Sequence, residues 1–228
     1  MNPDILYEDN HIIIVNKAPG DIVQGDKTGD ATLGDAIKHY LKMRYDKPGN
    51  VFLGVTHRLD RPTSGVVVFA KTSKALTRMN DLFRRGEVQK VYHAIVAKTN
   101  LGLLEPMTLE HYLTRNERLN KSTAHQKEVR DSKKAVLDFE NIASSDRYSL
   151  LQVHLHTGRH HQIRCQLAAI GLPIKGDLKY GAPRSNPDGS ICLHAREISF
   201  VHPVSKQPIH VVAPYPQTSL WQFFDNGE

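Results

Sequence analysis

The sequence HRLDRPTSGVVVFAK, residues 57–71, gives the clearest indication of the fold. Its second half contains GVVVFA, a short and continuously apolar run that predicts a buried strand. Pro62, which precedes this run, fixes one φ angle, and Gly65, which begins it, permits an unusual one, so we expect a tight turn before the strand. Such a turn would hold Asp60 in one place. Asp60 could cap the turn or form a structural ion pair, or it could be a reactive carboxylate held at the edge of a sheet.

Apolar residues at helical spacing predict three helices around this strand. Thr32 is expected to cap the first helix. The second is expected to be capped by Ser73 and to end at Gly86. The third is HHQIRCQLAAIG, residues 160–171, which ends in a glycine.

Short runs of alternating or continuous apolar residues predict the strands. They lie in ILYEDNHIIIVNK, as two strands joined by a turn, and in QKVYHAIVA, KKAVLDFENI and YSLLQVHLH, with a closing hairpin in REISFVHPVSKQPIHVVAP. Strands outnumber helices and are mostly joined without helical crossovers. This pattern predicts an α+β fold with a mixed, largely antiparallel central sheet and flanking helices and loops. The sequence has no internal repeat and no flexible linker, so we expect residues 1–228 to form a single domain.

The composition limits the class of protein. The chain has 228 residues, of which 39% are hydrophobic, which is enough for a sizeable core. No apolar run reaches the roughly 18 residues of a transmembrane helix, and the N-terminus lacks the pattern of a signal peptide. Cys165 and Cys192 form no CxxC or zinc-type spacing, so we expect free thiols and a cytoplasmic location. The net charge of +6 favours an anionic partner, most commonly nucleic acid.

Basic residues concentrate between Thr114 and Lys134, where seven lysines and arginines accompany three acids. This segment contains NERLNKSTAH and few large apolar residues, so we expect an exposed basic loop or ribbon. It could contact RNA phosphates, or it could be a solvated surface without a partner, and its charge alone does not decide between these. The candidate phosphate contacts are Arg118, Lys121 and Lys127.

A second basic cluster, HTGRHHQIR at residues 156–164, places a glycine turn at the start of the third helix. Free backbone N–H groups there, together with Arg159 and the two following histidines, would form a phosphate site. Arg164 lies beside the apolar stripe of the helix and therefore needs an acidic partner, for which we expect Asp60. The alternative is a metal site formed by the four histidines of residues 154–161, although no carboxylate stands at ligand spacing.

Tyr92 lies in the predicted strand QKVYHAIVA. A tyrosine in a strand is usually a core residue. Here its ring could equally be a platform on which a planar base stacks, with the hydroxyl near a reacting centre.

Taken together, these segments resemble the RluA-type pseudouridine synthases. HRLDRPTSG matches HRLDxxTSG, KVYHAIV matches KxYxAxV, and TGRHHQIRCQLAAIG matches TGRxHQIRxxLxxxG. GDLKYG, CLHA and FVHPVSKQPIHVVAPYP also fit, in the same order. One departure is NKAPGDIVQG, where the family reads NKPxGxxVH and Gln24 replaces a histidine. Many members carry an N-terminal S4 RNA-binding domain, and this sequence starts at the catalytic motifs, so we expect the catalytic domain itself to select the RNA.

The resemblance implies an enzyme that isomerises specific uridines in ribosomal or transfer RNA to pseudouridine, with no cofactor and no metal. Asp60 is the expected catalytic residue, and Arg58 would enter the space left by the flipped base. The other expected site residues are Tyr92, Arg164, Ile163 and Leu193 for the substrate nucleotide, and Lys17, Arg159, Arg118, Lys121 and Lys127 for the RNA. We expect a monomer that binds structured RNA, without a membrane or an obligate protein partner. Two alternatives stay open: an inactive RNA-binding protein of the same fold, and a metal-dependent hydrolase using the histidines of residues 154–161.

Overall fold

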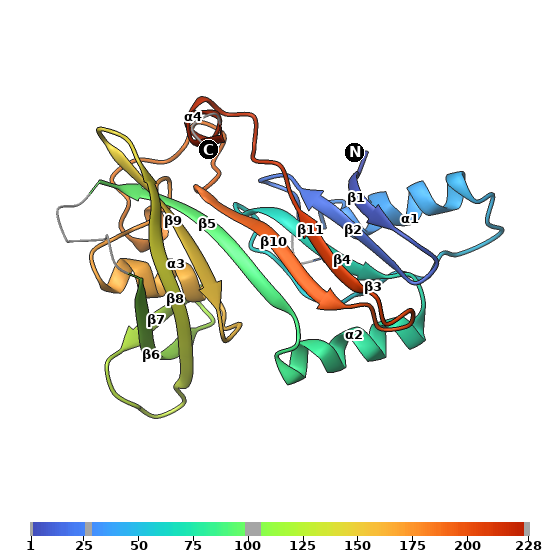
Figure 1. Cartoon of the computed structure of the whole chain (residues 1–228), viewed down its shortest axis with the longest axis horizontal. Helices are drawn as coiled ribbons and strands as arrows, with labels where there is room; N and C mark the ends of the chain where they lie inside the picture. Colours follow the sequence, from blue (N-terminus) through green and yellow to red (C-terminus); the bar gives the residue numbers. More distant parts are fainter. Residues whose placement is uncertain (1, 26–28, 99–105, 226–228) are drawn as a thin grey trace. The chain divides into compact units, whose positions relative to one another are not determined.

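The computed structural model describes residues 2–25, 29–98 and 106–225. Within these ranges the chain forms eleven β-strands and four α-helices (Figure 1). No described helix is both long and apolar enough to cross a membrane. The single domain expected from the sequence stays a prediction, because the chain divides into two compact units. The first unit is formed by Met1–Gln89 and Ala195–Gln217, and the second by Lys90–His194 and Thr218–Glu228.

The first unit is built around two strands that are buried almost completely. β2 (Ile12–Lys17) and β4 (Ser64–Ala70) pair antiparallel, and all but one of their residues are buried. β1 (Asp4–Glu8) pairs with β2, and the short β3 (Gly54–Val55) pairs with β4, both antiparallel. The buried strand predicted from GVVVFA is therefore confirmed as β4.

The first unit closes with the predicted hairpin of β10 (Leu193–Val201) and β11 (Pro208–Val212), which pair antiparallel. β10 enters this unit at Ala195. Its backbone passes so close to β4 that a Cβ atom on Gly65 would overlap the carbonyl group of Ala195. Gly65 also has a φ angle of +113°. Only glycine meets both requirements at the end of the HRLDRPTSG motif.

Two helices pack against opposite faces of the β2–β4 pair (Figure 1), because successive residues of a strand point to opposite faces. α1 (Leu33–Arg44) and α2 (Ser73–Arg85) are these helices. On one face, strand residues cluster with Leu33, Ile37 and Leu41 of α1; these are Ile13, Val15, Val67 and Phe69. On the other face, strand residues cluster with Met79 and Leu82 of α2; these are Ile12, Ile14, Val66 and Val68.

The helix ends follow the expected capping chemistry with one correction. Thr32 caps α1 and forms a reciprocal capping box with Asp35. The cap of α2 is Thr72 and not Ser73, because the Thr72 hydroxyl accepts the backbone N–H of Ala75. Gly86 ends α2 with a left-handed φ of +72°, as predicted.

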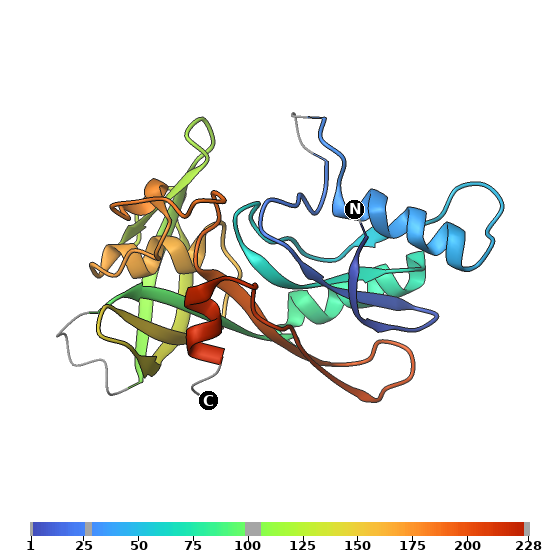
Figure 2. The same cartoon turned by 90° about the horizontal axis from the view of Figure 1, so that it is seen from above.

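The second unit contains five strands in the order β5-β9-β8-β6-β7, and all neighbours pair antiparallel. Their bounds are β5 (Gln89–Ala97), β6 (Met107–Asn116), β7 (Lys121–His125), β8 (Lys133–Ser144) and β9 (Tyr148–Leu155). The basic segment of residues 114–134, termed the basic ribbon, comprises the turn end of the β6–β7 hairpin, the loop after β7 and the start of β8. Figure 2 shows this hairpin as a two-stranded projection in light green. The first half of β6 was not predicted from the sequence as a strand.

The helices of the second unit are α3 (Gln162–Ala169), the short 3₁₀ helix η1 (Leu178–Tyr180) and α4 (Ser219–Asp225). α3 corresponds to the predicted third helix and contacts β6, β7 and η1. The predicted fold class is confirmed: the fold is α+β, with a mixed, mostly antiparallel sheet and flanking helices.

Candidate active site

Asp60 lies in a turn that is fixed to the buried strand β4. The backbone N–H of Thr63 donates to the Asp60 carbonyl over 3.0 Å, which closes the predicted turn. Before the turn, the Thr56 hydroxyl donates to the Val68 carbonyl over 2.6 Å, and His57 Nε2 accepts the Val68 N–H over 3.0 Å. These two side chains continue the β3–β4 pairing into the loop. The histidine of the HRLD motif therefore anchors the loop that carries Asp60.

Lys17 supports the same loop from inside the unit. Its side chain is fully buried, and Nζ donates to the carbonyls of Ala18 over 2.9 Å and Arg61 over 3.1 Å. Burial lowers the pKa of Lys17 to about 8, while the nearby carboxylates of Asp21 and Asp60 act in the opposite direction. This position differs from the RNA contact expected from the sequence. Lys17 holds the loop that follows Asp60 and places a cation close to its carboxylate.

The two arginines that flank Asp60 in the sequence are both exposed. Arg61 forms an ion pair with Asp30 over 3.1 Å, and both side chains are about half exposed, at 55% and 49%. Such pairs contribute little to stability. The exposure of Arg58 is compatible with the expected contact to RNA.

Arg164 occupies the centre of a buried cluster in the second unit. Its guanidinium donates to both carboxylate oxygens of Asp177, from Nε over 2.6 Å and from NH2 over 2.9 Å. It also lies 5.2 Å from the centre of the Tyr180 ring. The sequence correctly indicated that this arginine needs a buried acid, but it missed Asp177 in GDLKYG. The pair between Arg164 and Asp60 would join the two units and stays a prediction.

His161 lies immediately before α3 as a neutral ring, so it adds no positive charge to the expected phosphate site. Burial is the main cause that lowers its pKa to about 2, and the positive charge of Arg164 lowers it further. Nδ1 of His161 lies 2.9 Å from the hydroxyl of Tyr180. Arg159 is exposed and donates from Nε to the Lys134 carbonyl over 3.0 Å. Arg159 keeps the exposed positive charge expected of a phosphate contact at this turn.

The other expected substrate residues lie in the second unit and are buried. Tyr92 in β5 is 7% exposed and faces Val153 of β9 across the sheet, while Ile163 and Leu193 are each 4% exposed. Leu193 follows Cys192, whose carbonyl accepts the backbone N–H of Ile95 in β5. This burial fits both a core role and a closed, water-poor site for a base. The role of Tyr92 as a platform stays a prediction.

The histidines of residues 154–161 have separate protein partners. His156 pairs with Asp138 over 2.5 Å, His154 with Gln152 over 3.2 Å, and His160 with Asn120 and Ser122. The described ranges contain no group of three or more His, Cys, Asp or Glu side chains arranged to hold a metal ion. The histidine cluster therefore gives no geometric support to the hydrolase alternative.

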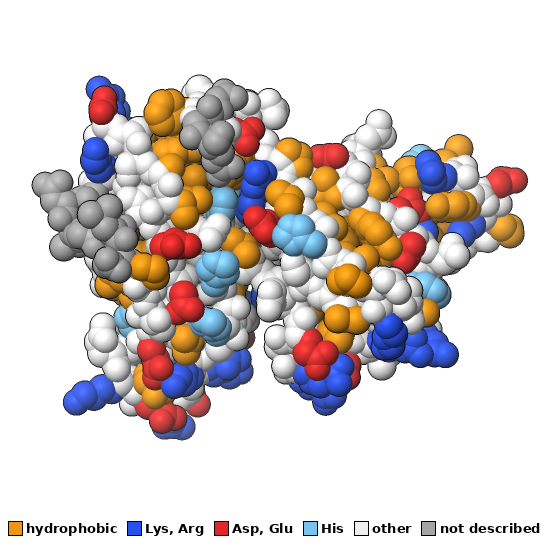
Figure 3. All heavy atoms as spheres, in the orientation of Figure 1, with side chains coloured by type: hydrophobic (Ala, Val, Ile, Leu, Met, Phe, Trp, Pro, Cys, Tyr) orange, Lys and Arg blue, Asp and Glu red, His pale blue; other side chains and the backbone are white. Residues whose placement is uncertain are grey.

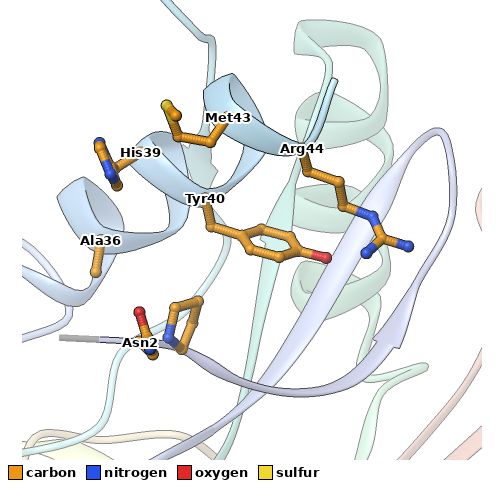
Figure 4. A pocket seen from close by; sticks show the side chains of 7 residues that line it. Asn2, Ala36, His39, Tyr40, Met43 and Arg44 are labelled. Carbon is orange, nitrogen blue, oxygen red and sulfur yellow. The ribbon is translucent and has the colours of Figure 1, made fainter. Parts of the chain in front are cut away.

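Of the basic candidates, Arg118 and Lys127 are exposed and Lys121 is partly buried. Figure 3 shows lysines and arginines, mixed with acids, at the end of the second unit where β6, β7 and β8 meet their loops. A pocket between α1 and the N-terminal residues Asn2 and Pro3, shown in Figure 4, contains no predicted site residue. It is lined by Asn2, Pro3, Ala36, His39, Tyr40, Met43 and Arg44.

Comparison with known proteins agrees with these motifs. The family model described as RNA pseudouridylate synthase matches residues 11–169. The chain is 34% identical to ribosomal large subunit pseudouridine synthase D of Xylella fastidiosa, over 94% of this chain and 66% of that protein. It is 30% identical to tRNA pseudouridine synthase C of Vibrio cholerae, over 96% of this chain and 93% of that protein.

The solved structure of human RNA pseudouridylate synthase domain containing 4 has the same fold, with a TM-score of 0.78. It is 23% identical, over 97% of this chain and 92% of that one. The chain spans about two thirds of the length of its relative from Xylella fastidiosa. The extent of the family match and the identity to several relatives establish that this chain belongs to the RNA pseudouridylate synthase family.

Proposed function

We propose that this protein isomerises specific uridines in ribosomal or transfer RNA to pseudouridine and that Asp60 is the reacting carboxylate. Relatives named for ribosomal and for transfer RNA both resemble the chain, which supports this class of substrate. The observation that carries the assignment of Asp60 is its fixed position. The turn to Thr63, the His57 anchor and the buried Lys17 hold one carboxylate at the start of a rigid strand.

The reaction requires few groups, because it rearranges bonds without gain or loss of atoms. The N1–C1′ bond of uridine breaks, the uracil turns, and C5 bonds to C1′. The proton lost from C5 is balanced by the proton gained at N1, and nothing is oxidised. Asp60 would either attack C1′ or remove a proton from C2′. Both routes need an ionised carboxylate at the sugar and a surface that holds the freed base.

The buried residues of the second unit would supply the rest of the site. Asp177 fixes the plane of the Arg164 guanidinium, which would balance the charge of Asp60. Tyr92 would stack on the uracil, while Ile163 and Leu193 would exclude water. Arg58 would occupy the space vacated by the flipped base.

The RNA would be held mainly by exposed cations. Arg118 and Lys127 on the basic ribbon and Arg159 at the start of α3 would contact phosphates, which position RNA without reading its sequence. Lys121 would contribute more weakly, because it is partly buried against Tyr180. We further propose that the protein acts in the cytoplasm as a monomer. Two buried free thiols support the location.

To test this proposal, pseudouridine is mapped in ribosomal and transfer RNA from cells with and without the gene. Purified protein is then added to the RNA from the cells that lack the gene. Wild-type protein should restore the missing sites. Asp60→Asn should restore none while binding the RNA within a few-fold, because the amide keeps the shape but loses nucleophilicity and basicity. Asp30→Asn, which changes an exposed carboxylate of the same unit, is the matched control and should act like wild type. Turnover by a verified Asp60→Asn protein would contradict the assignment.

A further inference from the structure

Tyr180 forms the middle of a chain of buried hydrogen bonds. The backbone N–H of Ser122 donates to the Tyr180 hydroxyl over 2.8 Å. The same hydroxyl forms a second hydrogen bond with Nδ1 of His161, 2.9 Å away. All three residues are buried, with 3%, 8% and 8% of their surface exposed. These hydrogen bonds therefore connect β7, in the basic ribbon, to the start of α3.

The ring of the same tyrosine contacts two cations. Arg164 lies 5.2 Å from the ring centre, and Lys121 of β7 also lies 5.2 Å from it. Both distances are within the range of cation–π attraction. Tyr180 thus contacts the ribbon at Lys121 and Ser122 and the substrate-side cluster at His161 and Arg164. A shift of the ring would weaken contacts on both sides at once.

Further hydrogen bonds fix the base of the ribbon to the same place. The Ser122 hydroxyl donates to the carbonyl of His160 over 2.8 Å. Nζ of Lys179, in η1 beside Tyr180, donates to the carbonyl of Asn120 over 3.0 Å. The turn of the ribbon, the helix start and η1 therefore form one hydrogen-bonded cluster. A displacement of the ribbon would be transmitted to the aromatic ring.

We propose that Tyr180 is a positioning residue that couples RNA bound along the basic ribbon to the orientation of Arg164. The inference rests on the proposed function, because it takes Arg164 as part of the substrate site. A phosphate near Lys121 would hold the start of β7 in place. Through Tyr180 it would favour the one arrangement in which His161 and Arg164 meet the target nucleotide. Binding energy from a remote part of the RNA would then raise the turnover rate, and not only the affinity.

The consequence is that RNA length should change kcat. Once mapping has identified a modified uridine, two transcripts provide the probes: the folded RNA region around the site and a minimal stem-loop with the same uridine. Wild-type protein should convert the longer RNA with a kcat about fivefold or more above that of the stem-loop, the lower end of measured coupling between sites. The measured quantity is the ratio of the two kcat values at saturating RNA.

Tyr180→Phe removes the hydroxyl and keeps the ring, and it should bring this kcat ratio close to one. The matched control is Tyr7→Phe, which removes a hydroxyl that donates to Asp9 over 3.1 Å in the first unit and should leave the ratio unchanged. Equal losses of kcat on both RNAs would show that Tyr180 only stabilises the fold and would overturn the inference. A loss confined to KM would also overturn it, because it would assign Tyr180 to affinity alone.

Lys121→Met provides an independent variant if Tyr180→Phe folds poorly. It removes the cation above the ring without leaving a buried polar group unpaired, and it should also bring the ratio close to one. An unchanged ratio in folded Lys121→Met would overturn the coupling. If Tyr180→Phe folds, adding Lys121→Met to it should not lower the kcat ratio further, because both substitutions interrupt the same coupling between the ribbon and Arg164. If wild-type protein forms no pseudouridine in either RNA, that result would contradict the proposed function itself.

Discussion

Arg164 and Asp177 form a two-point ion pair inside the second unit, with donor–acceptor distances of 2.6 and 2.9 Å. Their side chains are only 6% and 1% exposed. The planar guanidinium presents a rigid set of donors, so two bonds to one carboxylate fix the orientation of the guanidinium relative to Asp177. Arg164 and Asp177 therefore behave as one rigid group. Such an arrangement suits a residue whose charge must meet a reacting centre.

Arg164→Met should destabilise the second unit and abolish turnover. It leaves the Asp177 carboxylate buried without its cation, and breaking a buried pair in this way costs about 3–5 kcal/mol. Urea unfolding measures the loss, and pseudouridine formation on the mapped RNA measures activity. The double variant Arg164→Met, Asp177→Leu removes both charges and should regain most of the stability without activity. Recovery of turnover in the double variant would show that the guanidinium has no role in the reaction.

Lys17→Met should change how stability depends on pH. The pKa of Lys17 is lowered from 10.5 in the unfolded chain to about 8 in the folded one. Below pH 8 both states carry the proton, but between pH 8 and 10.5 only the unfolded state does, so this group makes wild-type stability rise with pH in that window. Over this whole pH window, the ionisation of Lys17 raises the free energy of unfolding by about 3 kcal/mol.

The buried thiol of Cys165 acts in the opposite direction in the same range, because burial raises its pKa to about 11. Its thiolate forms more readily in the unfolded chain, which lowers stability from about pH 9 upward. The measured quantity is therefore the difference between wild type and Lys17→Met in urea unfolding at pH 7 and pH 10. Wild type should gain stability relative to the variant as the pH rises. An equal pH dependence of both proteins would show that the lysine keeps its proton in the folded state.

Most of the fold was predictable from the sequence because its signals are local. The apolar run of β4, the Thr32 cap and the Gly86 stop each act within a few residues, and the structure has all three. The turn at Asp60 was predictable for the same reason, since Pro62 fixes its own φ angle and Gly65 permits a positive one. The cap of α2 was misplaced by one residue because Thr72 and Ser73 can both accept the same kind of bond.

The partners of buried charges were harder to predict because they depend on the tertiary fold. The sequence contains 24 acidic residues, and no local pattern distinguishes Asp177 from the others. Only its place in GDLKYG indicated that it matters. The burial of Lys17 did have a local signal, because it ends the strand IIIVNK, whose other residues are nearly all buried. The link from Ser122 to Tyr180 joins residues 58 positions apart, and no local pattern predicts it.

Tyr92→Ala should reduce kcat/KM by about 5- to 150-fold beyond any effect on folding, because base–aromatic stacking contributes about 1–3 kcal/mol. Tyr92→Phe keeps the stacking surface and should bind RNA like wild type. Phe139→Ala is the matched control. Phe139 is a buried aromatic residue that faces the same Val153 from the other neighbouring strand. Both alanine variants should lose stability, and only Tyr92→Ala should lose turnover in its folded fraction. Equal turnover in the two folded proteins would make Tyr92 an ordinary core residue.

The double variant Arg118→Gln, Lys127→Gln should weaken RNA binding and leave kcat near wild type. Both residues are exposed on the basic ribbon and its following loop, and the variant leaves Lys121 and its contact with Tyr180 intact. Each lost phosphate contact should reduce the slope of log affinity against log salt by about 0.7–0.9. The control, Lys38→Gln with Lys42→Gln, removes the same charge from exposed positions of α1 and should leave the slope unchanged. Filter binding at several salt concentrations measures the slopes. Identical slopes for the ribbon variant and wild type would mean that the ribbon is a solvated surface and that Arg58 and Arg159 hold the RNA instead.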